Sequence, residues 1–551
     1  MTQQTCRQVT GEVLVGCTAS HAMTSLMRRI PICGVVCIVI CHAWFAWAAH
    51  CYAVDADLLL QGGTIFDGTG SDGTIGDVAI RGERIAAVGR VDADKVGRVI
   101  DCRGLIVAPG FIDLHTHSDR TVVQPALRNT LNYLTQGCTT SVTGNCGLGP
   151  NKTAEYLNRI DHDGAGTNVI HLIPHGPLRR AGMGNAKRPA NAEEIQRMKA
   201  LIDKAMQAGA WGMSTGLIYQ WSCYADTDEL VALAKAVGAH GGIYASHIRS
   251  EADHLVEAVA EAIEIGRRAG VPVHISHFKV MGVPNWGNIR KAVELIEEAR
   301  RNGQKVTADQ YPYIASFTSS AATLFPETQI PGGRANLFKR MEADPRFAEK
   351  VREVIKGRLV RSRKIVVMSC KNPEWKGRSL ADIAAELNID RVDLALKLHK
   401  MGGGSAVNFA MCEEDVRYVM NVPWVATASD GWGHVAGAGV HCHPRNFGTF
   451  PRKIGHYAIS EKVIPLARAI RSATGLPAEI LGLSDRGHLR KDAHADIVVF
   501  DPKTFIDRAT FEKPAVYSTG VSYLFIAGNP AIDDGKPSKK LYGRSIRHRP
   551  K

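Results

Sequence analysis

The chain has 551 residues, of which 45% are hydrophobic and 22% charged, and its formal net charge is +13. This length and composition allow one large globular core with a smaller companion domain, and they argue against long disordered segments. The basic residues are scattered, apart from short runs such as 358–364 and 544–551. Scattered positive charge is typical of a solvated surface, so we expect no nucleic-acid partner.

Residues 1–53 form a segment of different character. Arg28 and Arg29 precede the apolar run IPICGVVCIVICHAWFAWAA, which ends in the small-x-small pattern AWA. This layout is typical of a secretory signal and predicts an exported, periplasmic protein. An uncleaved membrane anchor is the first alternative, because the run approaches spanning length. A cytoplasmic protein whose true start lies downstream is the second.

Short strand-like stretches with Gly and Asp turns occupy 54–104 and 485–551. Neither segment can bury a core by itself, so we expect the two to pair into one small β-sandwich domain.

Between these segments, 105–484 alternates apolar, β-branched runs with amphipathic helical runs. The predicted strands lie at 105–115, 138–145, 168–176, 210–217, 242–248, 271–278, 305–313 and 423–430. Continuously apolar strands separated by helices are typical of a parallel sheet covered by helices. Eight such units predict a (β/α)₈ barrel in the α/β class.

One interval breaks the rhythm of the barrel. About 110 residues separate Tyr313 from Pro423, and they include the helical pattern SLADIAAELN. We expect this insertion, at about 320–420, to cap the mouth of the barrel.

Polar residues fall where the predicted strands end, and chemistry in such barrels collects at the carboxyl ends of the strands. By itself an HxH pair is coincidence more often than a metal site, and a buried histidine or cysteine is usually a core residue. The coincidence of position at six strand-end residues predicts a metal centre. They are His115, His117, Cys146, His247, His277 and Asp430.

Cys146, in the turn VTGNCGLGP, has four interpretations: a small buried hydrophobe, half of a disulfide, a nucleophile or a metal ligand. Seven cysteines follow the leader without CxxC spacing, so at least one of them is unpaired in a mature chain. A nucleophile needs a base and an oxyanion hole, whereas the histidines are better explained as metal ligands. We therefore expect Cys146 to be a ligand, and nitrogen and thiolate donors favour zinc.

Eight motifs, in chain order, carry a family resemblance: FIDLHTHSD, GNCGLGP, STGLIY, YASHIRSE, ISHFK, DQYPY, ASDGW and HPRNFGTFPR. Together they closely resemble the N-acyl-D-amino-acid deacylases of the amidohydrolase superfamily, from about Asp55 to Pro530. The HxH pair is common to the superfamily, whereas GNCG and HPRxxGTFPR are specific to this group.

The resemblance implies a zinc-dependent enzyme that hydrolyses the amide of N-acyl-D-amino acids. Cys146, His247 and His277 would hold a tight zinc, and His115 and His117 would face a second position that is weaker or empty. Asp430 would accept the proton of the attacking water and pass it to the departing amine.

The resemblance also implies how the α-carboxylate of the substrate is bound. Lys279, Tyr311 and Arg445 would provide a point charge, a hydroxyl donor and a bidentate fork. Tyr219, after STGL, would line the side-chain pocket. Members that act on acidic substrates use a basic residue after YPY, but here no Arg or Lys follows until Arg334, which favours neutral or hydrophobic substrates.

The sequence is also compatible with three alternative functions. A dipeptidase for dipeptides that contain D-amino acids would use the same chemistry. A dihydroorotase-like or hydantoinase-like cyclic-amide hydrolase would normally carry a lysine at the end of strand 4, where this chain has Ser214-Thr215-Gly216. A non-catalytic binding protein ranks below an enzyme, because Asp430 and all the expected ligands are present.

Overall fold

The computed structural model describes residues 52–53, 55–92, 96–437 and 439–549. These residues belong to one compact unit. The predicted leader lies outside the described residues except for its end, where Tyr52–Ala53 form strand β1 and pair with β5 (Val91–Asp92). Within the described residues, no helix combines the length and the apolar character that crossing a bilayer requires.

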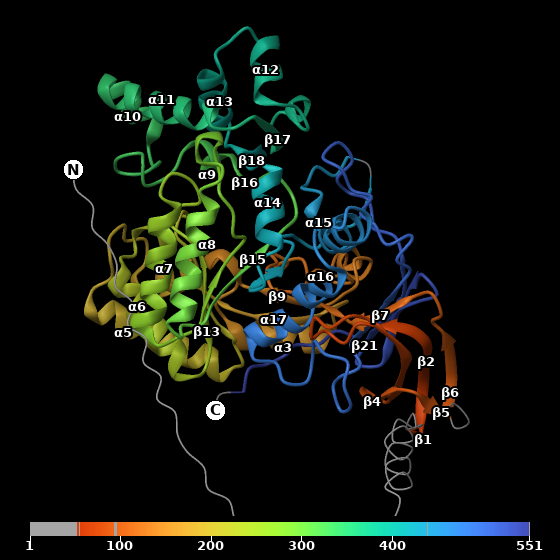
Figure 1. The fold of residues 1–551 in the computed structure, drawn as a ribbon. Helices are drawn as coiled ribbons and strands as arrows, with labels where there is room; N and C mark the ends of the chain where they lie inside the picture. The colour runs from red at the N-terminus through yellow and green to blue at the C-terminus, as the bar shows by residue number, and fades with distance from the viewer. Residues whose placement is uncertain (1–51, 54, 93–95, 438, 550–551) are drawn as a thin grey trace, which may run out of the picture. The chain divides into compact units, whose positions relative to one another are not determined.

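Eight parallel strand positions form a barrel, as the alternating pattern predicts (Figure 1). The third strand is interrupted at Leu172, and the ring closes where Thr116, after the first strand, forms a parallel bridge with Gly431, after the last. The strands are β8 (Phe111–Asp113), β9 (Cys138–Thr143), β10 (Asn168–His171) with β11 (Ile173–Pro174), β12 (Gly212–Gly216), β13 (Ile243–His247), β14 (Val273–Ile275), β15 (Val306–Gln310) and β19 (Val425–Thr427).

Amphipathic helices cover the outside of the barrel, and α5 to α8 pack in sequence order beside one another (Figure 1). Local sequence fixes where they begin: Asn191 and Glu194 form a capping box at α5, and Asp226 caps α6. The α-helices outside the insertion are α2 (Leu131–Leu134), α3 (Thr153–Asp163), α4 (His175–Met183), α5 (Ala192–Gln207), α6 (Thr227–Ala239), α7 (Leu255–Ala269), α8 (Ile289–Arg301), α14 (Glu413–Met420), α15 (Arg445–Pro451), which is buried throughout, α16 (Leu466–Ala473) and α17 (Gly475–Leu481).

The two ends of the described chain meet in one nine-stranded sheet, as expected of the small β-domain. Its strands are β2 (Ala56–Ile65), β3 (Thr74–Arg81), β4 (Arg84–Gly89), β6 (Val96–Asp101), β7 (Ile106–Pro109), β20 (Ile497–Phe500), β21 (Val521–Ile526), β22 (Asn529–Asp533) and β23 (Lys536–Pro537). Alternation along β20 explains how it is attached: Ile497 and Val499 face the core of the β-domain, whereas Val498 and Phe500 pack toward the barrel.

Two boundaries differ from those that the sequence suggested. The stretch 105–115 is two strands, because β7 pairs with β2 and β20 in the β-domain and β8 begins the barrel after Gly110. A Cβ at Gly110 would lie 2.2 Å from Thr139 Cγ2, so only glycine fits where the chain changes sheets. At the other end, Gly543 and Ser545 pair with the barrel, at Ala165 and Val169, and leave the β-domain.

The insertion has its own small core, built on an antiparallel sheet in the order β16-β18-β17. In Figure 1 it is drawn in green and teal and includes α10 to α13. It comprises β16 (Ser316–Ser319), α9 (Ser320–Leu324), α10 (Leu337–Ala343), α11 (Pro345–Val360), β17 (Lys364–Cys370), α12 (Leu380–Glu386), α13 (Arg391–Lys400) and β18 (Gly404–Phe409). The chain returns to the barrel at α14.

A lysine lies buried in the helical segment that follows β19, the eighth strand of the barrel. Lys453, in the π-helix η5 (Arg452–Ser460), is 1% exposed, and its Nζ has no hydrogen-bond partner among the described residues. Burial lowers the pKa of Lys453 to about 7. Between pH 7 and the ordinary lysine range, Lys453 is protonated in the unfolded chain but neutral in the folded one. The free energy of unfolding therefore falls as the pH drops through this window, and the full cost of burying Lys453 is present below neutral pH.

We expect Lys453→Met to stabilise the protein at pH 6–7, by roughly 2–5 kcal/mol from the shift in pKa. The gain should shrink as the pH rises toward 10, where lysine is neutral in both states. Denaturant unfolding of both proteins at several pH values measures this, with the exposed Lys462→Met as the control. A gain that does not depend on pH would contradict the prediction.

Candidate metal centre and active site

The carboxyl ends of the barrel strands open into a cavity of about 1670 Å³. His117, His247, His277 and Asp430 line it from the barrel, and Phe317 and Thr318 line it from the insertion. The insertion therefore forms part of the wall above the strand ends.

The turn that carries Cys146 is held by polar contacts from the turn after strand β8 and from strand β12. The carboxylate of Asp119 accepts a hydrogen bond from the Gly144 N–H (2.5 Å), and Ser214 Oγ accepts one from the Gly147 N–H (2.9 Å). Ser214 also donates to the Gly144 carbonyl. These contacts hold Cys146 in the left-handed backbone region, at φ 53°, which costs about 1 kcal/mol or more for a residue with a Cβ.

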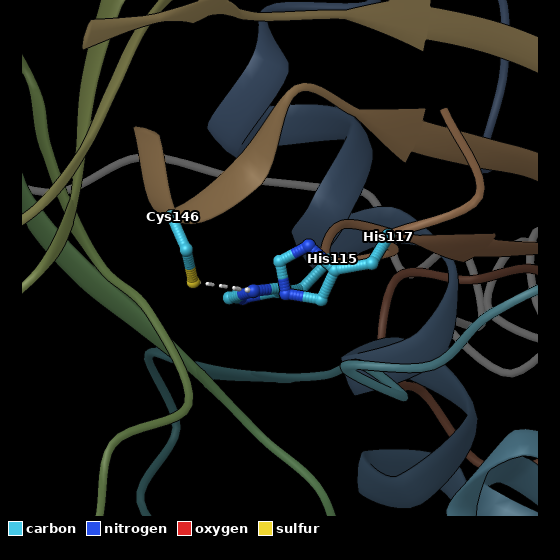
Figure 2. Close-up of side chains that lie close together, drawn as sticks. All are labelled: His115, His117 and Cys146. Carbon is cyan, nitrogen blue, oxygen red and sulfur yellow. Dashed lines mark hydrogen bonds between the residues drawn. The ribbon is translucent and has the colours of Figure 1, made fainter. Parts of the chain in front are cut away.

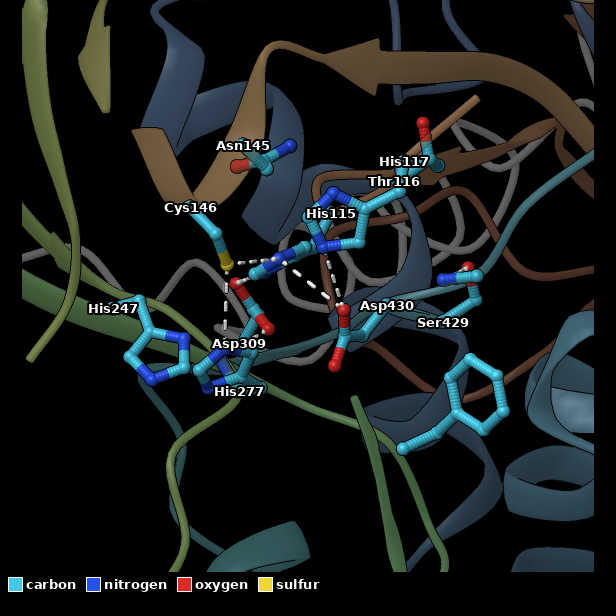
Figure 3. Close-up of polar contacts among 12 residues, drawn as sticks. His115, Thr116, His117, Asn145, Cys146, His247, His277, Asp309, Ser429 and Asp430 are labelled. Carbon is cyan, nitrogen blue, oxygen red and sulfur yellow. Dashed lines mark hydrogen bonds and ion pairs between the residues drawn. The ribbon is translucent and has the colours of Figure 1, made fainter. Parts of the chain in front are cut away.

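The Cys146 sulfur lies between two imidazoles. Its Sγ is 3.2 Å from His115 Nε2 and 3.4 Å from His277 Nε2, and Figure 2 shows the thiol pointing at His115. Two groups of donor atoms, each within 4.8 Å, share this sulfur: His115 and His117 on one side, His247 and His277 on the other (Figure 3). The geometry is that of two adjacent candidate metal positions with Cys146 between them.

The donor set fits a metal ion. His247 is 3% exposed, and neither of its ring nitrogens has a hydrogen-bond partner among the described residues. A buried polar atom without a partner costs about 1–3 kcal/mol, which a metal–nitrogen bond would offset. Buried imidazole and thiolate donors suit zinc.

The alternative roles of Cys146 fit the structure less well. The seven cysteines of the described residues are all free, so none forms a disulfide there. Burial, together with the charges of Asp430 and Glu251, raises the pKa of the Cys146 thiol well above its usual range. An activated nucleophile needs the opposite shift, whereas a metal ion would deprotonate the thiol on binding.

Asp430 follows β19, the eighth strand of the barrel, and its two carboxylate oxygens contact two different residues. Its Oδ1 is 3.0 Å from His117 Nε2, and its Oδ2 is 2.8 Å from Arg445 Nη1. Burial alone would raise the pKa of Asp430, but the Arg445 guanidinium and the imidazole of His115 hold it well below its usual range. The carboxyl is therefore ionised and can accept a proton or bind a metal.

Asp309, on strand β15, is a functional residue that was not predicted from the sequence. Its Oδ2 accepts from His115 Nδ1 (3.3 Å) and from His274 Nε2 (2.8 Å), and its Oδ1 accepts from the His277 N–H (2.8 Å). The bond to Nδ1 leaves His115 Nε2 free to face Cys146, so Asp309 sets the tautomer of a candidate ligand. Tyr311 could have pointed to Asp309 in the sequence, because residues two apart on a strand lie on the same face.

Glu251 was missed as well, although it stands in the motif YASHIRSE. Its Oε1 is 2.7 Å from His277 Nδ1 and 2.5 Å from Lys279 Nζ. Lys279 is 8% exposed, so its ammonium is buried among these groups and is not a solvated surface charge.

The residues expected to bind substrate lie near one another. The Tyr311 ring has the Arg445 guanidinium 4.6 Å and Lys279 Nζ 5.5 Å from its centre, and its hydroxyl has no partner among the described residues. Tyr219 lies beside His247, with 5.1 Å between the ring centres, and shares a hydrogen bond with Thr318 of the insertion (3.2 Å). Seven of the ten residues predicted for the site line the cavity. The other three, His115, Cys146 and Arg445, contact lining residues: His115 and Arg445 pair with Asp430, and Cys146 Sγ lies 3.4 Å from His277 Nε2.

A second cavity, of about 1540 Å³, is lined by the amino-terminal parts of the barrel strands. Basic side chains such as Arg300 and Arg468 line it, and none of the six candidate ligands does. Among the described residues, the groups that could hold a metal ion thus lie at the carboxyl ends of the strands.

A closed parallel barrel that gathers imidazole, thiol and carboxylate donors at its strand ends defines a metal-dependent hydrolase of the barrel type. The model of the amidohydrolase family matches residues 98–354 and 393–532. D-aminoacylase from Alcaligenes xylosoxydans xylosoxydans is 37% identical over 513 residues, which are 89% of this chain and 97% of that protein. The chain therefore belongs to the amidohydrolase family, in the N-acyl-D-amino-acid deacylase group that its motifs predict.

Solved structures show the same relationship. A D-aminoacylase, described by its binuclear metal center with one-metal activation and second-metal attenuation, has a TM-score of 0.77 at 34% identity, covering 90% of this chain and 100% of that one. N-acyl-D-glutamate deacylase from Bordetella bronchiseptica, solved with zinc and a phosphonate inhibitor, has a TM-score of 0.76 at 31% identity with the same coverage.

We expect Asp309→Asn to weaken zinc binding by about 10–100-fold, because the amide no longer fixes both His115 and His274. Competition with a chelator measures the zinc dissociation constant. Asp507→Asn is the matched control, since the Asp507 side chain is 7% exposed and pairs with Arg452, and neither residue lines the cavity. Equal zinc affinity in wild type and Asp309→Asn would show that this carboxylate does not position the ligands.

Proposed function

We propose that the protein is a zinc-dependent deacylase that hydrolyses N-acyl-D-amino acids to a carboxylate and a free D-amino acid. The observation that carries this proposal is the shared position of Cys146 between two groups of imidazoles, one of which, at His115 Nε2, lies 3.6 Å from the Asp430 carboxylate. The relationship to deacylases over most of the chain, one of them solved with zinc, supports it.

In this proposal Cys146, His247 and His277 hold the tight zinc, and His115, His117 and Asp430 face a second, weaker position. Bound by these residues, zinc would act as the Lewis acid, lowering the pKa of a water molecule and polarising the amide carbonyl. Asp430 takes the proton of the attacking water on its carboxylate and delivers it to the departing amine nitrogen. The ion pair with Arg445 keeps that carboxylate oriented toward the cavity.

Substrate orientation falls to the residues around Tyr311. Arg445, Lys279 and the free Tyr311 hydroxyl would grip the α-carboxylate, which separates amino-acid derivatives from simple amides. Tyr219 and Phe317 offer apolar surface to the side chain or acyl group. Arg358, on α11 of the insertion, also lines the cavity, so acidic substrates belong in the assay beside neutral ones.

Cyclic-amide hydrolysis is less compatible with this site. Ser214, at the end of strand 4, is committed to the turn around Cys146 and cannot take the place of a bridging lysine. Dipeptides with a D-residue keep the same scissile group and remain a second substrate class.

The test is release of free amine from N-acetyl-D-amino acids and N-acetyl-L-amino acids with neutral, hydrophobic and acidic side chains, with bound zinc quantified. We expect turnover of D substrates only, and loss of both zinc and activity in Cys146→Ala. Cys138→Ala, a buried cysteine outside the cavity, is the control. Full zinc and full activity in Cys146→Ala would refute the ligand assignment. Turnover of cyclic amides alone would refute the deacylase.

Asp430→Asn should separate catalysis from zinc binding. We expect kcat to fall about 10²–10⁴-fold, because the amide cannot accept the proton, while the tight zinc at Cys146 remains. Steady-state kinetics and metal analysis on the same sample measure both quantities. Retention of most of kcat would assign the proton transfer to another residue.

A further inference from the structure

All three donors of the Lys279 ammonium are in use. Its Nζ lies 2.5 Å from Glu251 Oε1, 2.9 Å from His277 Nδ1 and 2.9 Å from the His277 carbonyl oxygen. An ammonium group has three donors and no acceptor. In this arrangement the lysine expected to bind the substrate carboxylate has no donor to spare.

One of its acceptors is contested. His277 Nδ1 lies 2.9 Å from Lys279 Nζ and also 2.7 Å from Glu251 Oε1. A neutral imidazole carries one hydrogen, on one of its two nitrogens. Nδ1 therefore either accepts from Lys279 or donates to Glu251, and it cannot do both.

The two choices have different consequences for metal binding. When Nδ1 accepts from Lys279, the hydrogen is on Nε2, the nitrogen that faces Cys146, and that nitrogen cannot be a ligand. When Nε2 is a ligand, the hydrogen is on Nδ1 and is donated to Glu251. Lys279 then loses one acceptor and gains one free donor.

We propose that Glu251 is a positioning residue that couples zinc binding at His277 to recognition of the substrate carboxylate by Lys279. Glu251 accepts from Nδ1 in the zinc-binding tautomer, and it keeps the ammonium close while one donor is released toward the Tyr311 side of the cavity. The inference rests on the proposed function for the identity of the substrate, and on the contacts of the described residues alone for the coupling.

Coupling between zinc binding and carboxylate recognition predicts a pattern of zinc affinities and KM values that a purely structural role of Glu251 would not produce. Glu251→Gln should weaken zinc binding about 10–100-fold, because the amide –NH₂ can donate to Nδ1 and favour the wrong tautomer. Lys279→Met should leave zinc binding unchanged or tighten it, because the competitor for Nδ1 is gone. Both variants should raise KM for N-acetyl-D-leucine about tenfold or more, and change KM for N-acetyl-D-leucinamide, which lacks the carboxylate, by less than threefold.

The experiment measures zinc dissociation constants by chelator competition on the full chain, and KM for both substrates at saturating zinc. Glu257→Gln is the matched control: Glu257 lines the same cavity, but its side chain is 71% exposed. Thermal melting verifies that each variant is folded, and Glu251→Asp, which keeps the carboxylate, should recover part of the zinc affinity. Unchanged zinc affinity in Glu251→Gln, or equal weakening in Lys279→Met, would overturn the coupling.

The zinc measurements do not depend on turnover. If no acylated D-amino acid is hydrolysed but the two variants still shift zinc affinity as expected, the coupling to zinc stands and the proposed function fails. If turnover is normal and the zinc affinities of both variants equal that of the wild type, the proposed function stands and the coupling fails.

Discussion

The buried carboxylate of Asp309 is the constraint on which the arrangement of the site depends. It is 1% exposed and accepts hydrogen bonds from His115, from His274 and from the backbone of His277. An unpaired ion at that depth would cost several kcal/mol, so strands β8, β14 and β15 must bring these groups together for the protein to fold. The imidazoles are oriented by the same contacts that make the burial of the charge tolerable.

The backbone at the strand ends is strained in a consistent way. Cys146, His277 and Asp430 all adopt positive φ, at 53°, 38° and 50°. Each such residue costs about 1–3 kcal/mol, and the surrounding hydrogen bonds must hold it there. At Asp430 the closure of the barrel does so, because its N–H donates to the His115 carbonyl while the His117 N–H donates to Gly431. The hydrogen bonds that close the barrel therefore also orient the candidate ligands.

Two additions to the barrel give the site its surroundings. The β-domain, assembled from both ends of the described chain, packs Val498 and Phe500 toward Phe111 at the beginning of strand 1. The insertion, with a core of its own, brings Phe317 and Thr318 over the strand ends. The first addition braces the strand that carries His115 and His117, and the second shapes the space where a substrate would lie.

The sequence by itself determined the alternation of strands and helices, the HxH pair and the cysteine in a glycine-rich turn. These features are local, since periodicity, capping residues and strand ends are properties of neighbouring residues. Only the tertiary structure decided which groups hold the candidate ligands in place. Asp309 meets His115 across 194 residues, and Glu251 meets Lys279 across 28. The division of 105–115 between two sheets could likewise not be predicted from the sequence, because its two strands form one continuous apolar run. Contacts between distant strands depend on barrel closure and register, and no spacing along the chain encodes them.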